Sequence, residues 1–405
     1  MREKLKPKLR FNNFENPWNQ SLLMDQVEIR RGLTYKPNDV RSSGVRVLRS
    51  SNIVDDTFIL SDNDVFVDKA VVNIPRISNG DILVTAANGS TKLVGKHAIV
   101  ENLVDNEIVV HGGFMLLFKT EQNYFVNAWM SSNEYKRVLQ FVQGGNGAIG
   151  NLSSAILKSM KMSVPSFSEQ SAIGSLFNTF DDLLARYKDN LTNYQSLKAT
   201  MLAKMFPKAG QSVPEIRLDG FEGDWKEQTL GSLGSVAMNK RIFKNETSEN
   251  GDIPFYKIGT FGGTADAFIS KEKFQEYKEK YPYPEIGDIL ISASGSIGRT
   301  VVYKGEDAYY QDSNIVWLKH DQQLDNSYLK QYYGIIKWSG IEGTTIKRLY
   351  NKNILETNIF LPPSVAEQQA IGSYFSNLDN LINSHQEKIS QLETLKKKLL
   401  QDMFI

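Results

Sequence analysis

The fold is decided by a stretch that the chain contains twice. Residues 165–174 read Pro-Ser-Phe-Ser-Glu-Gln-Ser-Ala-Ile-Gly, and residues 363–372 read Pro-Ser-Val-Ala-Glu-Gln-Gln-Ala-Ile-Gly. The two copies align without gaps through Met205-Phe206 and Met403-Phe404, and 16 of these 42 positions are identical. Solenoid repeats are only about 20 to 50 residues long, so a spacing of about 198 residues indicates a duplicated domain instead.

Weaker similarities extend the repeat upstream. Residues 10–18 (RFNNFENPW) resemble residues 217–225 (RLDGFEGDW), and Gly-Asp-Ile-Leu occurs at 80–83 and again at 287–290. Each unit therefore has a variable part of about 150 residues followed by a matched segment of about 40, and a 405-residue chain is long enough for two such domains.

The matched segments are predicted to be long helices. Apolar residues recur at alternating spacings of three and four from Phe177 to Tyr194 and from Phe375 to Leu399, which is the seam of a coiled coil. Each helix is expected to contain about 38 residues and to be about 57 Å long. We expect the two helices to pair antiparallel, with the units related by a pseudo-twofold axis. The alternative is that each helix packs on its own globular domain.

The variable parts are predicted to mix helices and strands. Alternating stretches bounded by Gly, Asn and Asp are typical of strands, and they occur at residues 81–85, 114–118, 288–292 and 314–318. The predicted fold class is α+β, with two pseudo-symmetric globular domains separated by two long helices that pair as an antiparallel coiled coil. The expected divisions are an N-terminal domain (1–164), a central helix (165–207), a linker at 208–214 with a C-terminal domain (208–362), and a C-terminal helix (363–405).

The composition excludes several classes of protein. The chain has no cysteine, which rules out disulfides, thiolate zinc sites and iron–sulfur clusters and fits a reducing cytoplasm. We find no signal peptide and no run of about 18 apolar residues. With 47 Lys and Arg against 46 Asp and Glu, the net charge is +1, so any nucleic-acid binding depends on local patches or on a partner.

Motifs of the common catalytic sites are also missing from the sequence. It has no phosphate-binding loop, no G-x-G-x-x-G, no G-x-S-x-G and no Asn-Pro-Pro-Tyr-type loop of an amino-methyltransferase. The four histidines, at positions 97, 111, 320 and 385, are not spaced as metal ligands. The sequence therefore predicts a protein with no catalytic or metal site of its own.

Polar, glycine-rich segments occupy equivalent places in the two units. One pair, residues 86–92 and 293–299, follows the Gly-Asp-Ile-Leu strand, and the other, residues 143–151 and 342–352, precedes the long helices. Glycine permits close backbone approach, and Asn, Ser, Lys and Arg suit phosphates and base edges. The alternative is plain turns with solvated side chains. The candidate DNA-binding residues are Asn88, Ser90, Lys92, Asn146, Asn151, Ser294, Ser296, Arg299, Lys347, Arg348 and Lys352.

The segments before the two helices differ in chemistry. The second carries three cations that suit phosphates or guanine, Lys347, Arg348 and Lys352. The first carries amides that suit adenine or the DNA backbone, Gln143, Asn146 and Asn151. If these segments read DNA, the two units read different sequences. The lysine run 396–398 is interpreted as a solvated helix face rather than a binding patch.

Together these motifs resemble the specificity subunit of bacterial type I restriction-modification systems. The resemblance covers nearly the whole chain, and its most specific part is the doubled Pro-x-x-x-Glu-Gln-x-x-Ile that opens each long helix. It implies that each globular part is a target recognition domain that binds one half of a bipartite, asymmetric sequence in double-stranded DNA. It also implies that the paired helices act as a spacer between the two domains.

The resemblance implies partner subunits as well. The helices would dock two methyltransferase subunits, which bring S-adenosylmethionine, and restriction subunits that translocate DNA with ATP and Mg would complete the complex. This chain would then be a cytoplasmic, non-catalytic subunit that binds no cofactor and no membrane. The residues that match the family pattern at the implied methyltransferase interface are Pro165, Glu169, Gln170, Ile173, Gly174, Pro363, Glu367, Gln368, Ile371 and Gly372. Their alternative role is helix capping and packing.

Two other classes of function stay open at this stage. The first is an enzyme that modifies DNA by itself, which would transfer methyl groups as the purified chain with S-adenosylmethionine. The second is a coiled-coil adaptor that holds partners without reading DNA, which would show no sequence preference even with a methyltransferase partner present.

Overall fold

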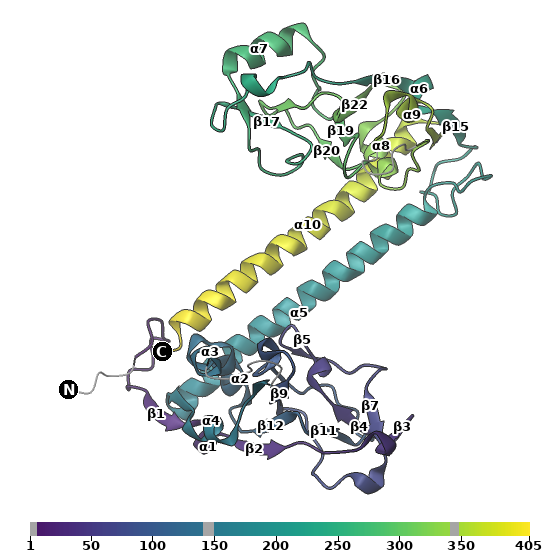
Figure 1. Cartoon of the computed structure of the whole chain (residues 1–405). Coiled ribbons are helices and arrows are strands. Elements are labelled where there is room, and N and C mark those ends of the chain that lie inside the picture. The colour runs from purple at the N-terminus through teal and green to yellow at the C-terminus, as the bar shows by residue number, and fades with distance from the viewer. Residues whose placement is uncertain (1–5, 141–149, 341–347) are drawn as a thin grey trace. The chain divides into compact units, whose positions relative to one another are not determined.

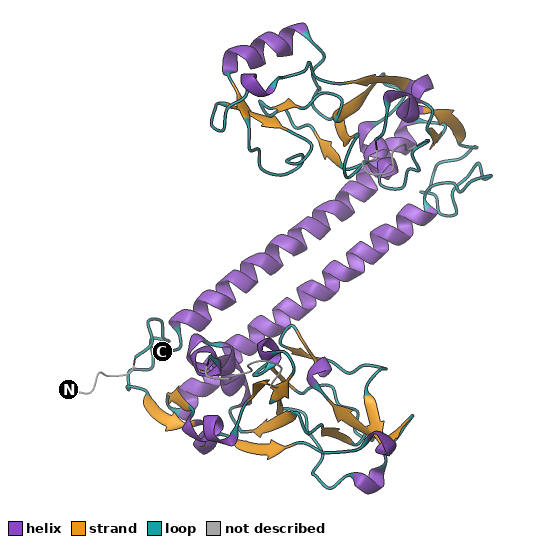
Figure 2. Ribbon diagram, viewed as in Figure 1, coloured by secondary structure: helices purple, strands orange, loops and turns teal. Residues whose placement is uncertain are grey.

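The structure, a computed structural model, describes residues 6–140, 150–340 and 348–405. It divides into two units: the first comprises Met1–Lys188 and Glu387–Ile405, and the second comprises Asp189–Gln386. Each unit holds one globular domain and a segment of each of two 38-residue helices, α5 (Phe167–Lys204) and α10 (Val365–Asp402) (Figure 1). Helices and strands are mixed in both units (Figure 2), which confirms the α+β class.

The first unit contains two four-stranded sheets. Its strands are β1 (Asn19–Leu22), β2 (Glu28–Arg31), β3 (Val40–Arg41), β4 (Val45–Leu48), β5 (Ile53–Val54), β6 (Thr57–Phe58), β7 (Val65–Val67), β8 (Ile82–Thr85), β9 (Ala87–Asn88), β10 (His97–Ile99), β11 (Val109–His111), β12 (Met115–Lys119), β13 (Gly150–Asn151) and β14 (Lys161–Val164). Its short helices are α1 (Leu23–Gln26), α2 (Asn123–Ser131), α3 (Asn133–Leu139) and α4 (Ser154–Ser159). The sheets have the orders β10-β8-β12-β2 and β11-β4-β7-β3, and β11 is parallel to β4.

The second unit repeats this plan with fewer strands. Its strands are β15 (Lys226–Thr229), β16 (Gly234–Ala237), β17 (Ile253–Tyr256), β18 (Phe268–Ile269), β19 (Ile289–Ser292), β20 (Thr300–Val302), β21 (Tyr309–Tyr310), β22 (Ile315–His320) and β23 (Asn358–Leu361). Its short helices are α6 (Leu230–Leu233), α7 (Lys271–Lys280), α8 (Asn326–Tyr333) and α9 (Asn351–Leu355). The sheets have the orders β16-β22-β19-β20 and β18-β17-β21.

The central sheet is the same in both units. Read from the outer strand, β20-β19-β22-β16 repeats β10-β8-β12-β2, and the register also repeats, since Met115 lies opposite Thr85 and Ile315 lies opposite Ser292. β8 and β19 begin at the Ile-Leu of the Gly-Asp-Ile-Leu repeat, and their residues are buried, as expected for central strands. The strands predicted near residues 81, 114, 288 and 314 are therefore confirmed.

Segments of α5 and α10 run antiparallel within each unit. In both units, residue numbers fall along α10 as they rise along α5: the contacts are Asp181–Lys396 and Lys188–Glu393 in the first unit, and Tyr194–His385 and Lys198–Asp379 in the second. The first turns of each helix pack instead on their own globular domain, through Ile173 and Phe177 in α5. Both packing modes considered from the sequence are thus present, on successive parts of each helix.

Each hydrophobic core is completed by the end of one long helix. Met403 and Phe404, after α10, lie in the core of the first unit, where the Phe404 ring centroid is 6.2 Å from that of Trp18. Met205 and Phe206, after α5, lie in the core of the second unit, where the Phe206 ring centroid is 6.2 Å from that of Trp225. The repeated Met-Phe of the sequence is therefore a core anchor, and each helix is fixed at both ends.

The backbone around these anchors also repeats. In the first unit the Leu9 amide donates to the Asp402 carbonyl over 2.8 Å, and in the second the Ile216 amide donates to the Lys204 carbonyl over 2.9 Å.

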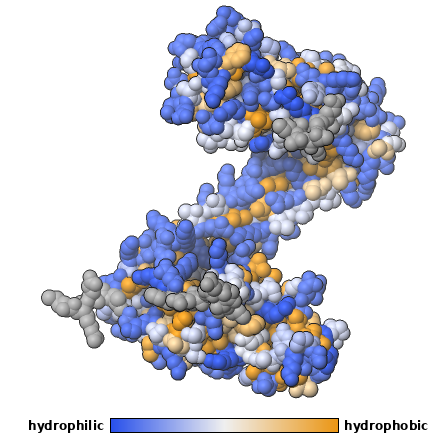
Figure 3. All heavy atoms as spheres, in the orientation of Figure 1, coloured by the Kyte–Doolittle hydropathy of each residue, from blue (hydrophilic) through white to orange (hydrophobic). Residues whose placement is uncertain are grey.

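Along the part of the chain that the structure describes, no helix is long and apolar enough to cross a membrane. Hydrophilic and hydrophobic residues are interspersed on the face shown in Figure 3.

Candidate nucleic-acid interface

A buried ion pair joins each long helix to the segment that opens its unit. Glu169 is fully buried, and its carboxylate accepts from the Arg10 guanidinium at Nε (2.6 Å) and Nη2 (2.7 Å). In the second unit Glu367 accepts from Arg217 over 2.7 and 2.8 Å. These hydrogen bonds raise the pKa of Arg10 and of Arg217 above the usual value, because they favour the charged guanidinium. Two repeated motifs thus meet in space and fix the start of each helix.

The ten residues assigned to a subunit interface by resemblance lie at these helix starts. Nine of them are buried within their own unit, and Pro363 is exposed. Gly174 packs closely on α2 and Gly372 on α8: a Cβ at Gly174 would lie 2.8 Å from the Phe125 amide nitrogen, and one at Gly372 would lie 1.9 Å from Ser327 Oγ. The alternative role in capping and packing accounts for these contacts, and the interface role stays a prediction.

The described ends of two polar segments pair with each other in the first unit. β9 pairs with β13, with Asn88 opposite Gly150 and Ala87 opposite Asn151, and the Leu152 amide donates to the Ala86 carbonyl over 2.8 Å. The paired residues lie about 60 positions apart in the sequence. Asn88 and Asn151, which the sequence places in separate segments, are therefore neighbours in this unit.

The second unit repeats this junction with different side chains. Ser294 and Arg348 form an isolated antiparallel bridge, and the Leu349 amide donates to the Ala293 carbonyl over 2.8 Å. By the repeat of the hydrogen bonds, Arg348 stands where the first unit has Asn151, and Ser294 stands where it has Ala87. Equivalent backbone positions thus carry an amide in one unit and a guanidinium in the other.

Asn314 organises the junction of the second unit. Its Oδ1 accepts from Ser294 Oγ over 2.7 Å and from Arg348 Nη2 over 3.5 Å. The Ser294 hydroxyl is buried, so its hydrogen bond is used inside the protein, whereas Arg348 is exposed. Of the two predicted residues at this bridge, Arg348 is the one available to a ligand.

Other predicted residues divide between exposed and occupied side chains. Ser90, Lys92 and Ser296 are exposed. The Asn88 amide is used locally, since Nδ2 donates to Ser50 Oγ over 3.3 Å and Oδ1 accepts from the Ser90 amide over 3.0 Å. Asn146 and Lys347 lie outside the described residues.

Two predicted cations are engaged within the chain. Arg299 Nη1 donates to the Phe261 carbonyl over 2.8 Å, which ties this loop to a neighbouring one. Lys352 Nζ lies 3.8 Å from Glu356 Oε1, but the Lys352 side chain is 80% exposed, so this ion pair is weak.

A correction concerns the lysine run at 396–398. Lys397 and Lys398 are exposed, whereas Lys396 pairs with Asp181 of the neighbouring helix and is not part of a solvated face.

A pocket in the first unit contains residues that the sequence did not indicate. Its volume is about 770 Å³, and it is lined by Asn88 together with Tyr35, Arg49, Ser50 and Phe114 among others. Phe114 is 66% exposed and Arg49 is also exposed. No sequence pattern marks Arg49, and Phe114 stands at the start of a predicted strand, where an apolar residue is expected to be buried.

The fold of the whole chain is that of a type I restriction-modification specificity subunit. The crystal structure of such a subunit from M. genitalium matches with a TM-score of 0.64 over 99% of both chains, at 15% sequence identity. Residues 222–394 also match the sequence model of the type I restriction modification DNA specificity domain.

Relatives identify the family. A Haemophilus influenzae protein provisionally named type I restriction enzyme specificity subunit S.HindORF215P is 38% identical over 309 residues, which cover 75% of this chain and 76% of the relative. A Salmonella potsdam type I restriction enzyme specificity subunit, StySPI, is 23% identical over 96% of this chain and 88% of its own length. The chain belongs to the type I restriction enzyme specificity subunits. It is accordingly a non-catalytic, DNA-recognising subunit of a restriction-modification system.

Proposed function

We propose that each unit of this chain reads one half of a bipartite, asymmetric sequence in double-stranded DNA through the junction of its two polar segments. One observation carries the proposal: the junctions at Asn151 and Arg348 have the same backbone pairing and different side chains. A carboxamide is suited to the N6 and N7 edge of adenine, and a guanidinium to the O6 and N7 edge of guanine. Two different half-sites follow from this difference.

In this proposal, one set of side chains fixes the position of the protein on the DNA, and another set reads the base sequence. The exposed cations Lys92 and Lys352 contact phosphates and fix the position of each domain, while Asn151 and Arg348 contact base edges in the major groove. We assign residues 1–164 and 208–362 to the two recognition domains. The helical segments 165–207 and 363–405 set the distance between the half-sites.

The chain is proposed to act with partners that supply the chemistry. Two methyltransferase subunits bring S-adenosylmethionine, and restriction subunits bring ATP and Mg. Because nine of the ten matched residues at the helix starts are buried, docking there would involve the exposed Pro363 and exposed neighbours such as Phe167 and Ser168. The site of action is the cytoplasm.

The test is co-expression with a type I methyltransferase subunit from the same genome, followed by single-molecule sequencing of host DNA for N6-methyladenine. A methylated motif with two defined halves and a fixed gap is the expected result, and cells with the methyltransferase subunit alone are the control. A stable complex without any methylated motif would refute DNA reading and favour the adaptor. Methyl transfer by the purified chain alone would refute the non-catalytic assignment.

A further inference from the structure

Phe114 forms a ridge between two hollows on the first unit. One hollow is the pocket with Arg49 and Asn88, and the other, of about 670 Å³, is lined by Arg31, Asn151 and Lys158 among others. Phe114 lines both hollows and is 66% exposed. An apolar ring thus borders both hollows, with Arg49 in the lining of one and Arg31 and Lys158 in the lining of the other.

The backbone holds this ring in place. The Phe114 carbonyl accepts from the Ala86 amide over 2.9 Å and from the Ala87 amide over 3.0 Å. These donors belong to the polar segment that follows β8, so the position of Phe114 is tied to that of Asn88. A side chain on a fixed backbone loses little entropy when it contacts a ligand, which favours an aromatic anchor here.

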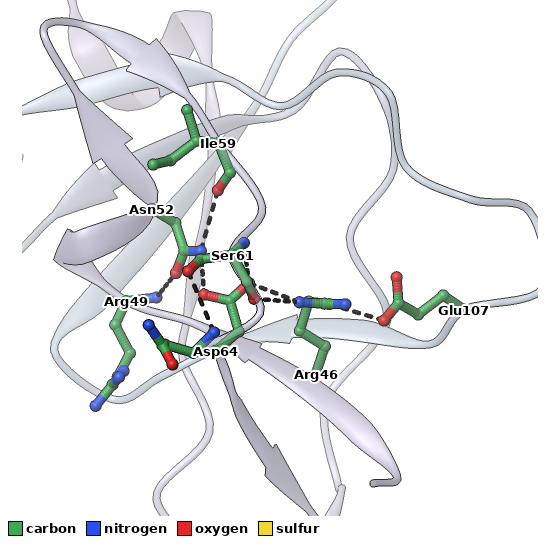
Figure 4. A network of polar contacts seen from close by, with 8 residues as sticks. Arg46, Arg49, Asn52, Ile59, Ser61, Asp64 and Glu107 are labelled. Carbon is green, nitrogen blue, oxygen red and sulfur yellow. Dashed lines mark hydrogen bonds and ion pairs between the residues drawn. The ribbon is translucent and has the colours of Figure 1, made fainter. Parts of the chain in front are cut away.

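A buried polar network fixes the turn that carries Arg49 (Figure 4). Asn52 is fully buried, and its Oδ1 accepts from the Arg49 amide over 2.7 Å while its Nδ2 donates to Asp64 Oδ1 over 2.6 Å. Asp64 in turn accepts from Arg46 over 2.7 Å, and Arg46 also donates to Glu107 over 2.7 Å. The network occupies the backbone of Arg49 and leaves its side chain directed away from the cluster (Figure 4).

The Arg49 guanidinium is unpaired within the part of the chain that the structure describes. Within the described residues it makes no hydrogen bond or ion pair, and no described carboxylate lines its pocket. Nearby Arg46 and Arg41 are both paired with carboxylates, at 2.7 Å from Asp64 and 3.2 Å from Asp68. An unpaired cation on a rigid turn in a pocket without acids is suited to an anionic or acceptor-rich ligand.

The position equivalent to Phe114 carries a polar residue in the second unit. Met115 and Ile315 occupy the same register position, so Phe114 is equivalent to Asn314. Asn314 accepts from Arg348 and aligns it, whereas Phe114 has no polar group and can contribute only apolar contact. At position 114 the first unit therefore lacks the side-chain amide that aligns a cation in the second unit, and Arg49 comes from a different turn.

We infer that Phe114 and Arg49 contact the half-site that the first unit reads. Phe114 packs against the 5-methyl group of a thymine, and Arg49 donates to DNA acceptor atoms beside that base pair, either guanine O6 and N7 or phosphate oxygens. The inference rests on the proposed reading of DNA by this unit.

The test for Phe114 uses the complex with its methyltransferase and duplexes that carry the motif found for the wild type. Replacing the contacted thymine with deoxyuridine removes one methyl group, and we expect about a fourfold loss of binding, since a buried methyl-sized group contributes about 0.8 kcal/mol. Phe114→Ala should lower binding and abolish this sensitivity to deoxyuridine, whereas Phe243→Ala, which removes a ring that is 60% exposed in the other unit, should retain it. Wild-type insensitivity at every thymine, or a sensitive Phe114→Ala variant, would overturn the inference.

The test for Arg49 compares Arg49→Ala with Arg41→Ala in the same unit. Arg49→Ala should weaken binding about tenfold or more, and Arg41→Ala should not. Loss confined to discrimination at one G·C pair identifies guanine, and a uniform loss with a reduced salt slope identifies phosphate. Equal behaviour of the two variants would overturn the role of Arg49. These failures differ from failure of the proposed function, in which the wild-type complex itself has no motif.

Discussion

The two units share their buried frame and differ on their exposed face. The ion pairs Arg10–Glu169 and Arg217–Glu367 repeat to within about 0.1 Å in their Nε–Oε1 distances, 2.6 and 2.7 Å. At the junction, by contrast, Asn151 is replaced by Arg348 and Phe114 by Asn314. The comparison indicates that the proposed recognition residues can change without disturbing the groups that fold the domain and anchor the helices.

The strongest test of the shared frame is removal of the helix anchors. Phe404→Ala and Phe206→Ala should each lower the free energy of unfolding by about 3–5 kcal/mol, because each deletes a buried ring from a core. Denaturant unfolding of the purified chain measures this loss, and the exposed Phe243→Ala is the control. A clear difference between the two variants in the loss of unfolding free energy would show that the two cores do not depend equally on their anchors.

The ion pairs come next in expected size. Glu169→Gln and Glu367→Gln should each lower the free energy of unfolding by about 3 kcal/mol, because each leaves a largely buried guanidinium without its charged partner. Thermal unfolding of the two variants checks this, with Glu28→Gln, at an exposed pair, as a control that should be unchanged. Wild-type stability in either variant would show that the pair adds nothing to the frame.

The difference between the faces is tested by Arg348→Ala. It should change selectivity in one half-site only, with a loss of about 1–3 kcal/mol in binding at that position. Methylation motifs of the mutant complex measure the effect, and the half-site read by the first unit should be unchanged. An equal weakening on all sequences, with a smaller dependence on salt, would show that Arg348 only contacts phosphate.

The smallest expected difference concerns acid stability. Burial lowers the pKa of His97, whose ring nitrogens Nδ1 and Nε2 lie 3.1 Å from the Gly95 carbonyl oxygen and 3.2 Å from the Asn127 carbonyl oxygen. The equivalent position in the second unit is Thr300. The folded state therefore binds its proton less readily than the unfolded state, so stability is retained above about pH 6.5 and falls by up to about 1.4 kcal/mol per pH unit below it. His97→Gln should reduce this slope between pH 7 and 5.5 in thermal unfolding. An unchanged slope would exclude His97 as its source.

The repeated frame was predictable because its residues are constrained by burial. Glu169 and Gly174 recur in the second copy because a buried carboxylate must meet a guanidinium and a close helix contact leaves no room for a Cβ. The predicted helices, the central strands and the family follow from those positions. Individual helix starts and ends were visible in the same way, through the repeated prolines and Met-Phe pairs.

For the exposed candidate DNA-binding surface, the sequence predicted the segments involved but not the contacts of individual residues. Asn151 and Arg348 were predicted because polar loops precede both helices, and they stay predictions. The contact of Arg299 with the Phe261 carbonyl could not be predicted, since only the tertiary structure brings the two together. Arg49 was missed because it reaches Asn88 and Phe114 through a turn that no sequence pattern connects to them. Exposed positions obey no periodicity, so their contacts depend on the folded arrangement.

Each long helix ends in the core of the unit in which the other long helix begins, and this has a consequence for cleavage of the chain. The linker at 208–214 joins the two copies, yet Phe206 on its N-terminal side is anchored in the second core and Phe404 is anchored in the first. A protease that cuts after Lys208 would produce two fragments, each holding a ring that fills the core of the other. Such a nicked protein should stay assembled without its covalent connection, so electrophoresis under denaturing conditions, and not gel filtration, would reveal the cut.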